Sequence, residues 1–131
     1  MRDITLASFL FDGDARTKTL ALGPLHLLCS LENNGYRVDY RDYQFWKTKH
    51  FFRIDSLVSF LAESCDTIGI SAIANLLPHI VLALKQIKQK APDKIVILGG
   101  PGPAVVAEPL LRHFPFIDAV VIGEGEKTMP E

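Results

Sequence analysis

The sequence has little of several features that would point to a particular class of protein. It has two cysteines in 131 residues, and its 14 basic and 15 acidic residues give a formal net charge of -1. A charge so near zero gives no electrostatic signal for nucleic acid or for an anionic membrane surface, so we expect neither as a partner. No apolar run reaches the ~20 residues that cross a bilayer, and the early charges do not fit a secretory signal. A cytoplasmic location is the resulting expectation.

Motifs for phosphate binding and for metal chemistry are missing too. The chain has no glycine-rich phosphate loop ending in Gly-Lys-Ser/Thr, no Gly-x-Gly-x-x-Gly after its first expected strand, and no Cys/His group with metal-ligand spacing. Cys29 and Cys65 lie far apart in apolar, helix-like settings, which favours buried reduced thiols. We therefore predict neither metal ligands nor catalytic residues in this chain.

Strand-like and helix-like segments alternate along the sequence. The expected strands cover residues 3–9, 36–43, 67–73, 95–98 and 117–122. Between them, apolar residues recur at the spacing of one buried helix stripe, and the expected helices cover residues 24–33, 54–64, 78–90 and 104–113. Strands that alternate with helices predict a single doubly wound α/β domain.

The composition of the strands predicts their order. Residues 36–43 alternate apolar and charged side chains, which is typical of a strand with one wet face or at the sheet edge. Residues 67–73 are apolar except for Ser71, as expected for a central parallel strand. With right-handed crossovers, these features favour a flavodoxin-like (Rossmann-like) five-stranded parallel sheet in the order 2-1-3-4-5. Such sheets bind ligands beyond the carboxyl ends of their strands.

Four loops meet at that edge, and each carries small or polar residues. The Gly-Gly turn at residues 99–100 would let a ligand approach the backbone closely, although by itself it also fits a tight strand-to-helix turn. The glutamates at 124 and 126 equally fit a solvated turn at a helix start. The candidate binding residues on the four loops are Asp12, Gly13, Ser71, Ala72, Asn75, Gly99, Gly100, Pro101, Gly102, Gly123, Glu124, Gly125 and Glu126.

Six segments follow one another along the chain: TIGISAI, a helix ending in IKQKAPDK, IVILGGPGP, AEPLL, FIDAVVIGEGE and KTMPE. In that order they resemble the amino-terminal cobalamin-binding domain of the cobalamin-dependent radical SAM enzymes. The pairing of the Gly-Gly turn with the downstream Ile-Asp-x-Val-Val-x-Gly-Glu-Gly-Glu run is the most specific part. The resemblance covers essentially the whole chain.

The resemblance implies that residues 1–131 form a cobalamin-binding domain cut from a longer protein. A radical SAM barrel would follow residue 131, cover the cofactor as the partner of this domain, and bind S-adenosylmethionine and an iron-sulfur cluster. This chain contains no Cys-x-x-x-Cys-x-x-Cys loop for such a cluster. In this domain the Ser71 hydroxyl would meet the nucleotide tail of cobalamin. Gly99 and Gly100 would let the tail or the ring edge lie against the backbone, and the carboxylates of Glu124 and Glu126 would accept hydrogen bonds from amide arms or ribose hydroxyls.

Two positions depart from related corrinoid proteins. Proteins of the methionine synthase type supply a cobalt-binding histidine after the first strand, but residues 11–18 contain none, so we expect base-off cobalamin without a histidine from this loop. Gly102 stands where family members often carry histidine. Elsewhere, His79, at the start of the third expected helix, is a further candidate for contact with the cofactor.

Two other interpretations stay open. One is a flavodoxin-like domain that binds a flavin or a nucleotide. The other is a partner-binding domain without a corrinoid, which the aromatic segment around Trp46 (residues 44–52) would favour; the same segment also fits a cover over the core.

Overall fold

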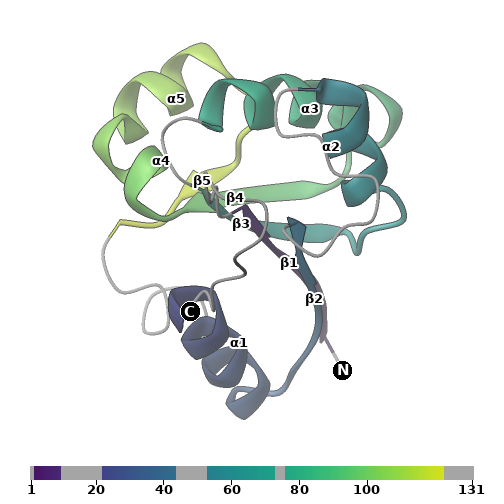
Figure 1. Cartoon of the computed structure of the whole chain (residues 1–131), viewed down its shortest axis with the longest axis vertical. Coiled ribbons are helices and arrows are strands. Elements are labelled where there is room, and N and C mark those ends of the chain that lie inside the picture. The colour runs from purple at the N-terminus through teal and green to yellow at the C-terminus, as the bar shows by residue number, and fades with distance from the viewer. Residues whose placement is uncertain (1, 10–21, 44–52, 73–75, 123–131) are drawn as a thin grey trace, which may run out of the picture.

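The computed structural model describes residues 2–9, 22–43, 53–72 and 76–122. Within these ranges, five strands form one parallel sheet in the order β2-β1-β3-β4-β5 (Figure 1). The strands are β1 (Arg2–Phe9), β2 (Tyr36–Asp42), β3 (Thr67–Ala72), β4 (Ile95–Gly99) and β5 (Ala119–Val120). The predicted flavodoxin-like architecture, its strand order and the edge position of β2 are confirmed.

Helices cover both faces of the sheet. Among the described helices, α1 (Leu22–Asn33) lies on one face, and α2 (Ile54–Leu61), α3 (Leu77–Lys90), α4 (Pro101–Val105) and α5 (Ala107–His113) lie on the other (Figure 1). The contacts of α1 with the sheet are chiefly with β1 and β2. Gly35 follows α1 with a φ of 87°, the left-handed conformation expected where glycine ends a helix. None of the helices in the described ranges has the length and apolar character of a membrane span.

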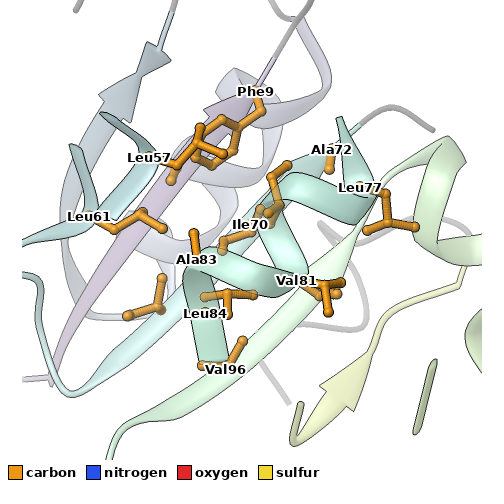
Figure 2. Packing of buried hydrophobic residues seen from close by; sticks show 14 of the residues in the cluster. Phe9, Leu57, Leu61, Ile70, Ala72, Leu77, Val81, Ala83, Leu84 and Val96 are labelled. Atoms are coloured by element: carbon orange, nitrogen blue, oxygen red, sulfur yellow. The ribbon is translucent and has the colours of Figure 1, made fainter. Parts of the chain in front are cut away.

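The main hydrophobic core lies between the sheet and the pair α2 and α3. Figure 2 shows Leu57 and Leu61 of α2 and Leu84 of α3 directed toward strand residues such as Ile70 and Val96. The buried residues of α3 include Ile80, Ala83, Leu84 and Ile87, which confirms the predicted stripe. Nearer the edge strand, the ring of Phe9 packs 5.3 Å from the rings of both Tyr43 and Phe60.

A second, smaller set of buried residues lies on the other face of the sheet, which we call the α1 face. Ile4, Leu6 and Leu31 are buried there and do not belong to the main core. Because side chains alternate along a strand, every strand residue between two core residues points to the α1 face. Leu27 and Leu28, which we predicted to point inward from α1, are only half-buried.

A polar network joins β1 and β2 to the end of α2. Thr5, fully buried, donates a hydrogen bond from its hydroxyl to Asp39 (3.2 Å) and accepts one from the backbone N–H of Cys65 (2.8 Å). Arg41 pairs with Asp39 and also donates to the carbonyl oxygens of Phe60 and Ala62. The guanidinium thereby satisfies carbonyl groups that the end of α2 leaves without helical partners. The charged side of β2 therefore binds the neighbouring helix end.

The crossover from β4 to β5 differs from the single helix predicted over residues 104–113. The helix begins earlier, at Pro101, breaks at Val106, and resumes as α5. Pro109 explains the break, because proline lacks the N–H and its ring clashes with the preceding turn in a helix interior. With the break at Val106, Pro109 lies in the first turn of α5, where proline is tolerated.

Three smaller predictions also need correction. β5 is shorter than residues 117–122, although Asp118 and Val121 still donate backbone hydrogen bonds to β4. The predicted turn at residues 99–102 is narrower, since Gly99 ends β4 and Pro101 begins α4. Cys29 is exposed and Cys65 half-buried, so both thiols are free but neither is buried as predicted. In α1 the buried stripe passes through Leu31, which leaves Cys29 on the outer side of the helix.

Candidate functional site

One row of in-register residues crosses the α1 face at the carboxyl ends of the strands. Ser8 of β1 pairs with Asp42 of β2 and with Ser71 of β3, and Ser71 pairs in turn with Gly99 of β4. We call these four residues the serine row. Because they are in register and have the same place in the alternation of their strands, they share one face of the sheet. The row brings together Ser71 and Gly99, two predicted site residues from separate loops.

Gly100, which follows the serine row in the chain, is required by the fold. Its φ of 98° lies in the region that side chains disfavour. A Cβ at this position would lie 2.7 Å from the carbonyl oxygen of Ala72 and 3.1 Å from its nitrogen. The ends of β3 and β4 therefore approach too closely for any side chain at this position. The tight turn from β4 to α4 therefore explains by itself why residue 100 is a glycine.

Gly99 is under no such constraint from the described residues. Its φ is not positive, and an added Cβ would meet nothing closer than the Cβ of Val121 at 3.9 Å, an ordinary contact. Glycine weakens a strand and gives it no side chain to pack. A glycine inside a strand often marks a bulge, a bend, or the close approach of a ligand or another backbone. Gly99 lies in the serine row beside Ser71, and the described residues leave room for a methyl group there.

The hydroxyl groups of the row differ in their partners. Ser8 is 2% exposed, and its hydroxyl shares a hydrogen bond with the phenol of Tyr40. Burial raises the pKa of Tyr40, the Asp42 carboxylate raises this pKa further, and the bond to Ser8 lowers it. Ser71 is half-buried, and within the described ranges its hydroxyl forms no hydrogen bond. The Ser71 hydroxyl is therefore available to a ligand.

Among the described helices, α1 lies on the α1 face and has its main contacts with β1 and β2. We call the part of this face over β3, β4 and β5 the β3–β5 half. There Gly69 is buried, Ile97 and Ala119 are half-buried, and Ile95 is 48% exposed. The β3–β5 half adjoins Ser71 and Gly99 and is largely apolar.

The other predicted site residues in the described ranges lie differently. The side chain of Ala72 points into the main core, so only its backbone borders Gly100. Pro101 and Gly102 form the first turn of α4. His79 lies in the first turn of α3, on the face opposite the serine row. Asp12, Gly13, Asn75, Gly123, Glu124, Gly125 and Glu126 lie outside the described residues, as does the aromatic segment 44–52.

Sequence reasoning missed Ser8 and Tyr40. A signal was present, since serine is the next-to-last residue of both β1 and β3. Only the strand register, however, places Ser8 beside Ser71, and the pairing of β1 with β2 brings Tyr40 to Ser8. In the described ranges, no three His, Cys, Asp or Glu side chains gather closely enough to hold a metal ion.

A comparison with protein families agrees with this geometry. The model of the B12 binding domain matches residues 13–131, which is most of the chain. The chain therefore belongs to the B12-binding domain family. A comparison with curated proteins found no match.

Proposed function

We propose that the chain binds cobalamin at the carboxyl end of its sheet and is the cobalamin-binding module of a radical SAM enzyme. The family match over residues 13–131 is the observation that carries the cobalamin part. The position of Gly99 beside Ser71 at the carboxyl ends of the strands supports the same conclusion independently.

The residues of the site suit the chemistry of this cofactor. Cobalamin combines a broad, largely apolar ring, neutral amide arms and a nucleotide tail, so it needs apolar surface, close backbone approach and a few hydrogen-bonding groups. The β3–β5 half of the α1 face is largely apolar and carries no charged side chain in the described part of β3, β4 or β5. Gly99 allows close approach, and Ser71 offers one hydroxyl that can donate or accept.

In this proposal the described residues bind and orient the cofactor and do no chemistry themselves. Ser71 would hold the nucleotide tail by a hydrogen bond, and the bare backbone of Gly99 would let the tail lie against β4. Gly100 would act indirectly, because it fixes the approach of β4 to Ala72 and so the position of Gly99. When bound, the cobalamin would supply a cobalt centre that carries a methyl group or an electron.

The radical SAM part of the proposal rests on the order of the sequence motifs. A following barrel would supply S-adenosylmethionine and an iron-sulfur cluster and would cover the exposed side of the corrin ring. Glu124 and Glu126, which lie outside the described residues, would then accept hydrogen bonds from the amide arms of the ring. The substrate would be bound by the barrel, so the reaction would belong to the longer protein.

Titration of the purified chain with hydroxocobalamin tests the proposal. We expect the corrin to co-elute with the protein on gel filtration and to show a base-off visible spectrum, since no histidine is expected from residues 11–18. A base-on spectrum would mean that the tail stays on cobalt. Flavin mononucleotide is the matched competitor ligand: co-elution of the flavin without the corrin would favour the flavodoxin-like alternative.

If neither ligand binds, the same titration should be repeated with a longer protein that includes the barrel. Failure there would overturn the cobalamin proposal and favour a partner-binding domain. Retention of the corrin only in the longer protein would show that the barrel completes the site. Iron and sulfide analysis of that protein tests the radical SAM part separately, because the absence of a cluster would contradict it.

A further inference from the structure

We infer that a second copy of this chain pairs with β2 in the antiparallel direction and extends the sheet across a twofold axis at Val38. The surface concerned is the outer edge of β2, whereas the proposed cobalamin site lies at β3 and β4, on the other side of β1. The inference therefore goes beyond the proposed function and does not depend on it.

The strand β2 ends the sheet. In the ranges that the structure describes, β2 pairs with β1 alone, and no other strand lies along its outer edge. An edge strand presents a row of backbone N–H and C=O groups that can pair with another chain. The seven residues of β2 include neither proline nor glycine, the two residues that weaken strand pairing. Charged side chains usually discourage such pairing, so the pattern of charges on β2 decides which partner it suits.

That pattern is self-complementary. When two copies of residues 36–40 (YRVDY) pair about Val38, Arg37 of each copy lies opposite Asp39 of the other, and each tyrosine lies opposite a tyrosine. Opposite charges and aromatic pairs are among the cross-strand pairs that stabilise antiparallel sheets. A twofold interface is isologous, so each of these pairs occurs twice. A second copy of the chain is therefore the partner that β2 fits.

The neighbouring registers are unfavourable. If the axis moved one residue on, to Asp39, then Arg37 would lie opposite Arg41, and Asp39 would lie opposite its own copy. If the axis moved one residue back, Arg37 would lie opposite its own copy. Like charges directly opposite each other destabilise a strand pair. The charges therefore select the register centred on Val38.

Arg37 and Asp39 each keep one atom for this contact. Arg37 binds Asp3 through Nε and Nη2, both at 2.6 Å, which leaves Nη1 without a partner among the described residues. Asp39 accepts hydrogen bonds from Thr5 and Arg41 through Oδ2, which leaves Oδ1 in the same situation. The side chains of Arg37 and Asp39 are 65% and 41% exposed. A charge-assisted bond from Nη1 to Oδ1 of the second copy would therefore form without breaking the bonds within each chain.

Helix α1 would add apolar surface to the same interface. It has its main contacts with β2, and its Leu25, Leu27 and Leu28 are only half-buried. A twofold axis perpendicular to the sheet puts matching faces of the two copies on the same side. The two α1 helices would therefore lie on one face, on either side of the axis, and contact between them would remove leucine surface from water.

Single cysteines test the register, in a chain that also carries Cys29→Ser and Cys65→Ser. Opposite residues of antiparallel strands have Cα atoms about 4.5–5.5 Å apart, which a disulfide can span. Val38→Cys should therefore give a disulfide-linked dimer on mild oxidation, as seen on a non-reducing gel. Tyr36→Cys is the matched control on the same strand and face. Its two copies would lie four residues, or ~13 Å, apart, so it should stay monomeric.

Sedimentation equilibrium of the whole chain measures the association itself. We expect a monomer–dimer equilibrium. Arg37→Glu, which places a carboxylate opposite Asp39, should raise the dissociation constant of the dimer about ten-fold or more. Arg112→Glu is the control, because Arg112 is 64% exposed in a comparable ion pair on α5. This variant should leave the dissociation constant unchanged.

Three results would each overturn the inference: a chain that stays monomeric at millimolar concentration, a dimer that Arg37→Glu does not weaken, and equal disulfide yields from Val38→Cys and Tyr36→Cys. If a cysteine variant does not fold, as judged by circular dichroism, the masses of the unchanged chain and of Arg37→Glu still decide. All three results would leave the proposed function intact, because the cobalamin titration measures a different site.

Discussion

Gly100 and Ala72 meet where β4 and β3 end: a Cβ on Gly100 would lie 2.7 Å from the carbonyl oxygen of Ala72. The glycine before it, Gly99, has room for a methyl group, with its nearest neighbour at 3.9 Å. The two glycines of one turn therefore have different roles. Gly100 maintains the fold, and Gly99 leaves space at the proposed site.

Gly100→Ala should destabilise the protein. The positive φ alone costs about 1–3 kcal/mol for a residue with a Cβ, and the contact with Ala72 adds to this cost. Urea denaturation should show a lower midpoint, and the free energy of unfolding should fall by at least that amount. Gly23→Ala is the control, since a Cβ there meets nothing within 4 Å and alanine is the better helix former. Equal stability of the Gly100→Ala variant and the unchanged protein would contradict the described turn.

Gly99→Ala should separate binding from stability. The free energy of unfolding should change by less than about 1 kcal/mol, because the added methyl group makes only ordinary contacts. The affinity for hydroxocobalamin should fall about ten-fold, since overpacking against a ligand costs about 1–3 kcal/mol. Denaturation and visible-spectrum titration of the same preparation measure both quantities. A folded variant with unchanged affinity would remove Gly99 from the proposed site.

Ser71→Ala should weaken cobalamin binding by about three- to ten-fold, the usual worth of one hydrogen bond. Stability should hardly change, because within the described ranges the Ser71 hydroxyl forms no hydrogen bond to lose. Ser59→Ala, at an exposed position of α2, is the matched control and should leave the affinity unchanged. If Ser71→Ala binds as tightly as the unchanged protein, the tail does not use this hydroxyl.

Tyr40 should make stability fall at alkaline pH. Burial raises the pKa of Tyr40 above the ordinary tyrosine value of ~10, so the unfolded chain loses this proton more readily than the folded chain. The contribution of Tyr40 is therefore fully present below pH ~10 and is lost as the pH rises through the folded pKa. Denaturation curves at several pH values from 8 to 11 measure the loss.

Tyr40→Phe should remove the fall in the free energy of unfolding that the ionisation of Tyr40 causes at alkaline pH. At neutral pH the variant should be less stable by about 1 kcal/mol, because the hydroxyl of buried Ser8 loses its partner. Tyr36→Phe is the control on the same strand and face. Its free energy of unfolding should still fall at alkaline pH, because Tyr40 remains. If Tyr40→Phe has the same pH dependence as the unchanged protein, the phenol is not buried as described.

Local patterns predicted the architecture well but not the differences between neighbouring residues. The stripe through Leu57 and Leu61 and the alternation in β2 depend on burial alone, and both are visible in the sequence. The break at Val106 was missed because spacing rules count apolar residues and ignore the N–H that Pro109 lacks.

The site could be predicted only in part, for a related reason. The loop ends identify Ser71 and Gly99, since carboxyl ends of parallel strands share one edge. Which of two adjacent glycines the fold requires depends on a distance to Ala72, across strands far apart in sequence. The hydrogen bond between Ser8 and Tyr40 likewise depends on strand register, which no single segment encodes.

The bond from Cys65 to Thr5, between residues 60 apart in the chain, bears on the order of folding. β1 is made first during synthesis, yet it lies between β2 and β3 and pairs with both. It cannot acquire its second neighbour until β3 has emerged, and closing so long a loop slows folding. Until then one edge of an apolar strand stays open to other chains. We therefore expect nascent chains that end before β3 to aggregate.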